Sequence, residues 1–238
     1  MSSANRVGRV REDPRISVPK LGEYMDVRQA NRRERIIRDQ KYPSNFILTH
    51  YADAQKAIRA ALLAGPDFDG PLGEKSKTIA ARGPTMRHQI DAQRCSLDAI
   101  AAFRELWLTM PLDGVCRFVL GRMEFALFVE NVSVSVFPTV MLQRTWPDGR
   151  SETGALLLVF RKEAALQEHG GEAAAEVLRR ALARAKVPGV SRELCIVADV
   201  FAQEHFCAPK SNIRLMREVE AACREIAVVW PTVQSKAA

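Results

Sequence analysis

The apolar residues of this chain change their spacing near its middle, and that change limits the folds open to it. The stretch 85–110 repeats apolar side chains at the three- and four-residue spacing of one helix face, and a proline ends the pattern. Residues 123–129 and 132–137 then alternate or run apolar, which is the period of a strand. Glu130 and Asn131 between them are the right number of residues for a tight hairpin turn. Both periods in one chain predict an α+β protein.

The remaining segments extend this pattern toward the C-terminus. Pro138 demands a bend or a bulge, and residues 139–144 continue the second strand beyond it. A continuous apolar run, 154–160, is typical of a central strand, and 193–200 supplies a fourth. Helices are predicted over 172–185 and 211–229. The expected fold is a mixed four-stranded sheet flanked by helices, with an αβββαβ-like order and a helical subdomain in front of it.

Changes in composition divide the chain into four parts. Residues 1–18 have no apolar period and are interpreted as a basic flexible tail. Residues 19–64 are predicted to form a small basic helical subdomain. The stretch 65–84 is rich in Gly, Pro and Lys, so it is interpreted as a linker with one helical turn. Residues 85–231 form the expected α+β core.

Several classes of protein and site are disfavoured by what the sequence lacks. No apolar run approaches the ~18 residues that a spanning helix needs, and the first thirty residues lack an apolar signal-peptide core. We therefore expect a cytoplasmic protein without a membrane partner. The five cysteines are odd in number and widely spaced, which favours reduced thiols over a disulfide framework or a zinc site. His205 and Cys207 are the one close His and Cys pair.

Positive charge is concentrated at the start of the chain. The net charge is +7, and residues 1–50 hold eleven Lys or Arg against six Asp or Glu, a local excess of +5. Basic clusters favour polyanions, because each neutralised phosphate releases condensed counterions. The helix predicted to end near Gln40 carries four of these cations, and Lys41 follows it directly. The candidate nucleic-acid-binding residues are Arg32, Arg33, Arg35, Arg38 and Lys41. The same pattern also fits a solvated helix face without a ligand.

Residues 125–160 contain the segment that resembles a known family. A hairpin over 125–136 is followed by Pro138 and Thr139, a glycine-containing turn and the apolar strand 154–160. With the helices around it, this order resembles the core of the PD-(D/E)XK nuclease superfamily. In that family the second strand bears a metal-binding Asp after a Pro or Gly, and the third bears an acid two residues before a Lys. Residues two apart on a strand face the same side, so the acid and the Lys point together at the metal and the phosphate.

The chain departs from the family pattern at the residues that carry the chemistry. Thr139 stands in the place of the Asp, and Ala155 and Leu157 stand in the places of the acid and the Lys. The charged residues near that strand, Arg161, Lys162 and Glu163, come only after its end. Two or three carboxylates are needed to hold Mg²⁺, and Glu105 on the preceding helix is the one family acid that the resemblance leaves. The resemblance thus implies a degenerate nuclease core with no metal and no cofactor, and an unrelated α+β domain stays open beside it.

Two further residues complete the catalytic candidates, which are Glu105, Asp199 and Lys162. Asp199 ends an apolar strand and His205 lies six residues on, so a carboxylate and an imidazole are expected to meet at the carboxyl edge of the sheet if they have a function. The alternative is an Asp that caps a turn. Lys162 is the lysine nearest the end of the third strand.

The main hypothesis for function is a non-catalytic nucleic-acid-associated protein that binds phosphates through the basic helix. It predicts that replacing Arg32 and Arg35 by Glu removes binding. One alternative is a protein-interaction subunit that uses Ile36, Ile37 and the last helix to dock on a partner or on a second copy. Another is a Mg²⁺-dependent nuclease with a displaced active site, so whether the protein is an enzyme stays open.

Overall fold

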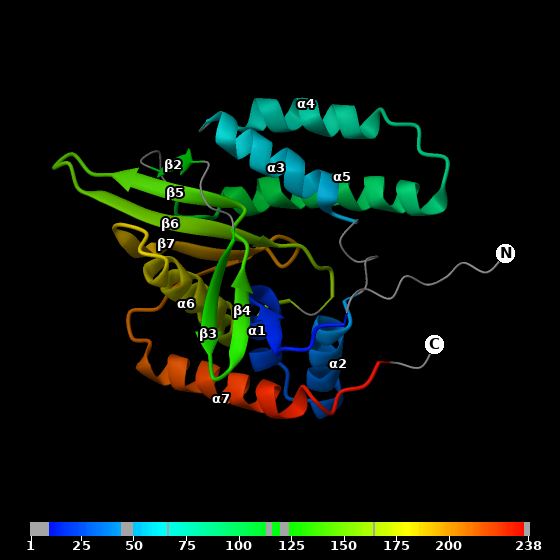
Figure 1. The fold of residues 1–238 in the computed structure, drawn as a ribbon. Helices are drawn as coiled ribbons and strands as arrows, with labels where there is room; N and C mark the ends of the chain where they lie inside the picture. The colour runs from blue at the N-terminus through cyan, green and yellow to red at the C-terminus, as the bar shows by residue number, and fades with distance from the viewer. Residues whose placement is uncertain are drawn as a thin grey trace.

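The computed structural model describes residues 10–43, 50–65, 67–112, 116–119, 124–163 and 165–235, and it confirms the α+β class. Figure 1 shows helices gathered above and below a twisted sheet, with a separate hairpin in front. The helices are α1 (Val18–Asp26), α2 (Ala30–Lys41), α3 (Ala52–Ala64), α4 (Asp69–Ala80), α5 (Arg87–Trp107), α6 (Glu168–Arg184) and α7 (Ile213–Val229). The strands are β1 (Arg15–Ser17), β2 (Cys116–Val119), β3 (Phe125–Val129), β4 (Val132–Val136), β5 (Val140–Thr145), β6 (Ser151–Val159), β7 (Val190–Asp199) and β8 (Glu204–Cys207).

The described strands form two sheets. Sheet A has the order β1-β4-β3, with β1 parallel to β4 and β3 antiparallel to it. Sheet B has the order β2-β5-β6-β7-β8, in which β6 and β7 are parallel and the other neighbours antiparallel. Helix α6 connects the parallel pair, as a crossover between parallel strands requires.

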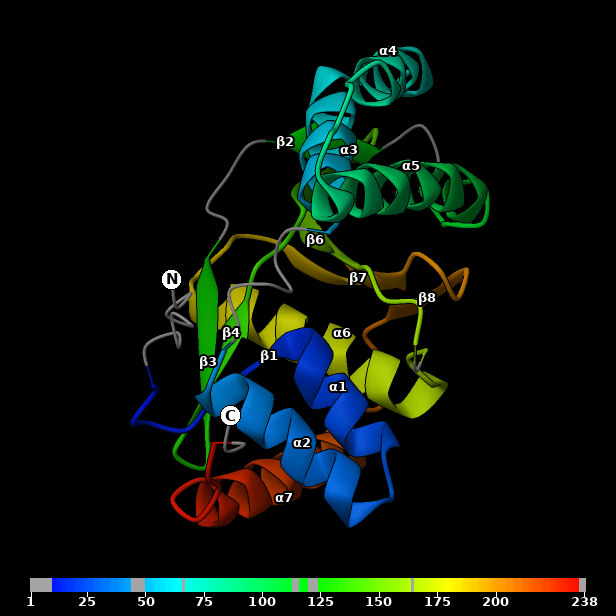
Figure 2. The same cartoon turned by 90° about the vertical axis from the view of Figure 1, so that its right-hand side faces the viewer.

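Sheet B is covered on both faces, which explains the continuous apolar run in β6. Leu157 and Val159 point into one core, which also holds residues of α1, α2, α6, α7 and sheet A. Leu156 and Leu158 point into a second core together with residues of α3, α4 and α5. Figure 2 shows the two groups of helices on opposite sides of the sheet. Successive residues of a strand face opposite sides, so both sets must be apolar here.

Sheet A, by contrast, packs on a core with one face, and its outer face is partly exposed among the described residues. Its hairpin turn at Glu130 and Asn131 has positive φ angles of 48° and 64°, the backbone of a type I′ turn. The predicted hairpin is confirmed for the residues described, and Met123, where its first strand was expected to begin, lies outside them. On β3, Leu127 faces the first core, whereas Ala126 and Phe128 are exposed on the outer face.

The chain passes from one sheet to the other at Pro138, and this differs from the single four-stranded sheet that was expected. β4 ends at Val136 in sheet A, and β5 begins at Val140 in sheet B. Pro138 has no N–H for a ladder, so pairing is interrupted there. Pairing resumes at Thr139, whose N–H donates to Leu156 O (2.7 Å). What looks like one bent strand in the sequence therefore belongs to two sheets.

Four elements were not expected. Strand β1 lies in the segment predicted to be a loose tail, and β2 and β8 are four-residue edge strands of sheet B. Helix α4 lies in the predicted linker, where only one helical turn was expected. Its Pro71 stands in the first turn, where no N–H is needed, and Leu72 and Ile79, one heptad apart, are buried in the second core. Strands β1, β2 and β8 were missed because three or four residues are too few to show the alternation of a strand.

The two cores group the N-terminal helices in a way that the sequence did not indicate. α1 and α2 contribute to the first core, and α3 contributes to the second. The predicted division of the chain into parts stays a prediction, and residues 1–9 of the predicted tail lie outside the described residues. No helix in the described ranges is long and apolar enough to cross a bilayer.

Candidate functional site

The basic residues of α2 fall into two groups in the structure. Arg33 is engaged three times: its Nε donates to Val27 O (2.7 Å), its guanidinium pairs with Glu225 on α7 (3.0 Å), and it lies over the Tyr24 ring at 5.0 Å. Arg38 pairs with Glu34 one turn away at 2.6 Å. The contacts of Arg33 attach α2 to α1 and α7, whereas the pair of Arg38 lies within α2.

Lys41 holds the end of α7. Its Nζ donates to the carbonyl oxygens of Trp230 (2.8 Å) and Val233 (2.9 Å), with Pro231 O at 3.4 Å. Trp230 is the C-cap of α7, next to the negative end of the helix dipole, and Pro231 and Val233 follow the helix. The Tyr42 hydroxyl also donates to Val233 O (3.3 Å). A lysine has three donors, so Lys41 can reach these carbonyls together. Its geometry is that of a structural residue.

Arg32 and Arg35 are the exposed members of the predicted set. Arg35 reaches only 3.9 Å from Asp39, and its side chain is 73% exposed. No described residue accepts a hydrogen bond from the Arg32 side chain. The internal contacts of the other three leave Arg32 and Arg35 as the more exposed of the five predicted phosphate contacts, and the assignment itself stays a prediction.

The residues that dock on a partner in the alternative hypothesis are part of this protein's own core. Ile36 and Ile37 are 4% and 1% exposed and lie in the first core. The apolar face of α7, with Met216, Val219 and Ile226, is buried in the same core. Ile36, Ile37 and this face of α7 are thus covered, whereas Ile213 and Val228 of α7 are exposed, and docking on a partner stays a prediction.

Glu105 does not meet the strand residues of the family pattern. Thr139 lies beside β6, where its Oγ1 accepts a hydrogen bond from Leu158 N (3.1 Å), and Leu157 points into the first core. Glu105 is exposed on α5, whose buried residues Phe103 and Leu106 pack in the second core on the opposite face of sheet B. The structure does not bring these three positions together.

Asp199 and His205 point to opposite faces of sheet B, so they do not converge as suggested. Asp199 follows Val197 of the first core at the two-residue spacing, and His205 is paired with Ala198 of the second core. Asp199 is fully buried and accepts hydrogen bonds from Leu166 N (3.1 Å) and Ala202 N (3.4 Å). These hydrogen bonds connect the loop that follows β6 to the loop that follows β7.

Lys162 is engaged at the surface. Its Nζ pairs with Asp98 at 2.7 Å, and this hydrogen bond raises the pKa of the lysine. Across the described residues, no three His, Cys, Asp or Glu side chains lie close enough to hold one metal ion. Asp199 Oδ2 likewise lies 3.5 Å from Arg161 Nε, and no hydrogen bond or ion pair among the described residues joins the three catalytic candidates to one another.

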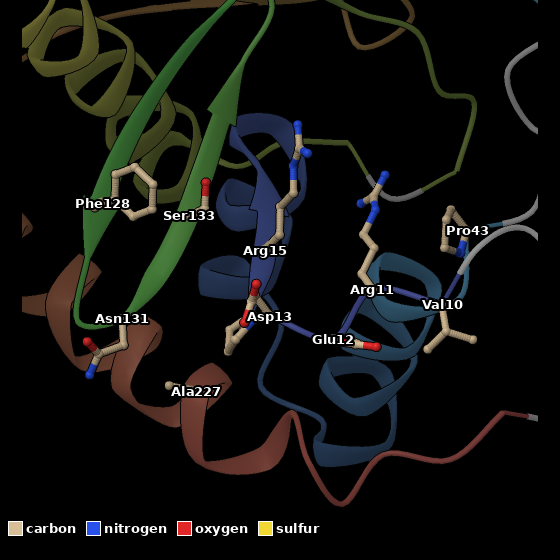
Figure 3. A pocket seen from close by; sticks show the side chains of 11 residues that line it. Val10, Arg11, Glu12, Asp13, Arg15, Pro43, Phe128, Asn131, Ser133 and Ala227 are labelled. Atoms are coloured by element: carbon tan, nitrogen blue, oxygen red, sulfur yellow. The ribbon is translucent and has the colours of Figure 1, made fainter.

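A groove opens on the uncovered face of sheet A. The cross-strand register pairs Phe128 with Ser133 and Ser133 with Arg15, so these three residues form a row over β3, β4 and β1. Their neighbours along the strands point into the first core, which places the row on the outer face. The groove over this row has a volume of about 1170 Å³ and is also lined by Arg11, Asp13 and Asn131. We call it the sheet A groove (Figure 3).

Backbone hydrogen bonds fix the segment that carries its cations. Ser133 N donates to Pro14 O (3.0 Å), Arg11 N donates to Lys41 O (3.0 Å), and Trp230 Nε1 donates to Glu12 O (3.0 Å). The segment before β1 is thus attached to β4, α2 and the end of α7. Figure 3 shows that Arg11 and Arg15 project from this segment, with Asp13 beside the base of Arg15 and Glu12 beside Arg11.

The electrostatics of the groove differ from those of α2. Burial lowers the pKa of Arg11, and the neighbouring charge of Arg15 lowers it further. Among the described residues, the Arg11 side chain donates to Gln40 O (3.2 Å), and Arg15 Nε is buried without a hydrogen-bond partner. Neither arginine forms an ion pair with any described carboxylate. Two guanidinium groups therefore line one groove unpaired within the described part of the chain, although the carboxylates of Glu12 and Asp13 also line it.

Sequence reasoning missed this groove, although one signal was present. Phe128 occupies an outward position in the alternating strand β3, and its side chain is 65% exposed. An aromatic residue at the polar position of an alternating strand marks an unusual surface. Arg11 and Arg15 carried no such signal, because they lie in and before a three-residue strand.

No protein-family model, curated protein or solved structure matches the chain. The resemblance to the PD-(D/E)XK nuclease superfamily stays a prediction.

Proposed function

We propose that this protein binds nucleic acid at the sheet A groove and does not cleave it. The observation that carries the proposal is the pair Arg11 and Arg15, which face one open groove without an ion-pair partner among the described residues. Burial is the main cause of the lowered pKa of Arg11 and the charge of Arg15 adds to it, and a bound phosphate would offset that repulsion between the two cations. Arginine also offers phosphate two parallel donors, which makes it suited to a strand backbone.

The charge distribution supports the same ligand. Residues 1–50, which include Arg11 and Arg15, carry an excess of +5 positive charges. An extended polyanion gains affinity from many such charges at once. The absence of cleavage rests on the side chains described above: Thr139, Ala155 and Leu157 cannot ligate a cation as carboxylates do, and Glu105 lies apart from them.

A salt titration of binding tests the proposal. A fluorescently labelled single strand is titrated with the protein at several salt concentrations, and anisotropy gives the association constant at each. The logarithm of that constant should fall linearly with the logarithm of salt. Replacing Arg11 and Arg15 together by Gln should lower the slope by roughly 1.4, since each single-strand phosphate contact contributes about 0.7.

The control variant removes the same charge elsewhere. Arg87 and Arg184 are exposed on α5 and α6, and replacing both by Gln should leave the slope unchanged. Salt-independent binding, or equal slopes for the groove variant and the wild type, would overturn the proposal. Incubation of a labelled strand with Mg²⁺ or Mn²⁺ should leave it intact, and cleavage that depends on the protein would contradict the non-catalytic part.

A further inference from the structure

We propose that the sheet A groove takes a single strand whose unpaired base stacks on Phe128 while Arg15 holds a neighbouring phosphate. The inference rests on the proposed function and names the form of nucleic acid and the contact that selects it. Its basis is the row formed by Phe128, Ser133 and Arg15, three side chains that differ in kind but share one face of sheet A.

Phe128 presents a ring to solvent where a strand normally places a polar side chain. It is 65% exposed, and its neighbour Ala126 and its partner Ser133 are too small to cover it. Figure 3 shows the ring beside Ser133 at the edge of the groove. An open aromatic face on a sheet is the feature on which single-stranded nucleic acids stack their bases.

The spacing of the row fits one base with its phosphate. Neighbouring strands lie about 4.8 Å apart, so the backbones of Phe128 and Arg15 are separated by roughly 10 Å across Ser133. Both side chains rise on the same side of the sheet. Ser133 between them has a small hydroxyl side chain, which leaves room for a sugar.

The groove carries both signs of charge, and this argues against a uniform phosphate track. Glu12 and Asp13 line it beside Arg11 and Arg15 on the same segment. A carboxylate repels phosphate but accepts hydrogen bonds from the amino groups of bases. The arginines therefore suit one neighbouring phosphate, and the carboxylates suit a base edge.

The duplex form is excluded from this contact by its own stacking. In a double helix the faces of the bases are covered by their neighbours, so an aromatic ring cannot lie on them without unstacking the helix. Binding through Phe128 should therefore distinguish a single strand from the duplex made with its complement, even though the duplex carries more phosphate charge.

The test compares a short single strand that contains 2-aminopurine with its duplex. Stacking on Phe128 should change the fluorescence of 2-aminopurine in the single strand when the wild-type protein binds. Phe128→Ala should weaken single-strand binding on the order of tenfold and abolish that fluorescence change, because stacking on an aromatic is worth about 1–3 kcal/mol per base. Phe128→Leu keeps an apolar side chain without a ring and should behave like Phe128→Ala, whereas Phe128→Trp should restore both readouts.

The matched control is Leu108→Ala, which removes an apolar side chain that is 86% exposed at the end of α5. It should change neither readout. Circular dichroism of each variant shows that it is folded. Salt-dependent binding that Phe128→Ala leaves unchanged would overturn the stacking inference while the proposed function stands. Absence of any salt-dependent binding by the wild type would overturn both.

Discussion

Helix α2 and the segment around β1 both carry arginines near the start of the chain, yet the structure uses them differently. On α2, Arg33 and Arg38 are held by carboxylates and Lys41 by the carbonyls that end α7. Before and within β1, Arg11 and Arg15 face a groove without an ion pair in the part of the chain that the structure describes. The density of positive charge along a helix therefore does not show which cations are free to meet a ligand.

The largest expected difference between the two regions is in stability, and it should follow from a substitution of Lys41. Lys41→Met keeps much of the stem but leaves Trp230 O without its side-chain donor, and it leaves Val233 O to the Tyr42 hydroxyl at 3.3 Å. We expect a loss of about 2 kcal/mol in the free energy of unfolding, the cost of unsatisfied acceptors at a helix end. Urea denaturation followed by circular dichroism measures it. Unchanged stability together with weaker nucleic-acid binding would show that Lys41 belongs to the interface.

The second largest effect should be on binding. It is measured by comparing the arginine pair of the groove with the exposed arginine pair of α2. Replacing Arg11 and Arg15 by Gln should weaken single-strand binding roughly tenfold or more, since charge-assisted hydrogen bonds to phosphate are lost. Replacing Arg32 and Arg35 by Gln removes the same charge from α2 and should change the affinity less than about twofold, because only long-range attraction is lost. Anisotropy at fixed salt measures both. A larger effect of the α2 pair would restore the original assignment of the phosphate contacts to α2.

Arg33 should have a smaller effect on stability than Lys41. Arg33→Met removes the pair with Glu225 and the hydrogen bond to Val27 O, but the side chain is 30% exposed and water can replace part of these contacts. A loss of about 1 kcal/mol is expected. Glu225→Gln, which removes the charge of the partner only, should cost less than Arg33→Met. Equal stability of the wild type and Arg33→Met would mean that α2 is not attached through this residue.

The smallest effect should be at Arg38, whose pair with Glu34 lies within one helix. Such pairs contribute about 0.3–0.5 kcal/mol and weaken with salt. Arg38→Gln should therefore lower the unfolding midpoint only slightly at low salt, and the difference from the wild type should shrink at high salt. A loss comparable with that of Lys41→Met would show that Arg38 has a tertiary role that its contacts do not indicate.

The hairpin and the central strand could be predicted because their residues carry a local pattern. Alternation over 125–136 with Glu130 and Asn131 between the strands indicated the turn, and the run 154–160 indicated a strand covered on both faces. Helix α4 was missed because its glycines and proline resemble a linker, whereas its buried Leu72 and Ile79 become visible only against the second core. The separation at Pro138 was seen as a bend, but a bend does not say which sheet the chain joins next.

The candidate site was predicted less well than the fold. Cationic side chains on α2 were recognised from their number, yet their partners Glu225 and Trp230 are almost two hundred residues away in the chain. Phe128 was placed correctly in a strand, but its exposure depended on what covers the outer face of sheet A. No local pattern contains that information.

The order of helices and strands, the hairpin turn and the excess of positive charge at the start of the chain follow from the sequence by itself, because each depends on neighbours within a few residues. The division into two sheets, the engagement of Arg33 and Lys41, and the row of Phe128, Ser133 and Arg15 were decided by tertiary structure. Burial, pairing and register depend on segments that are distant in the chain and meet only when it folds.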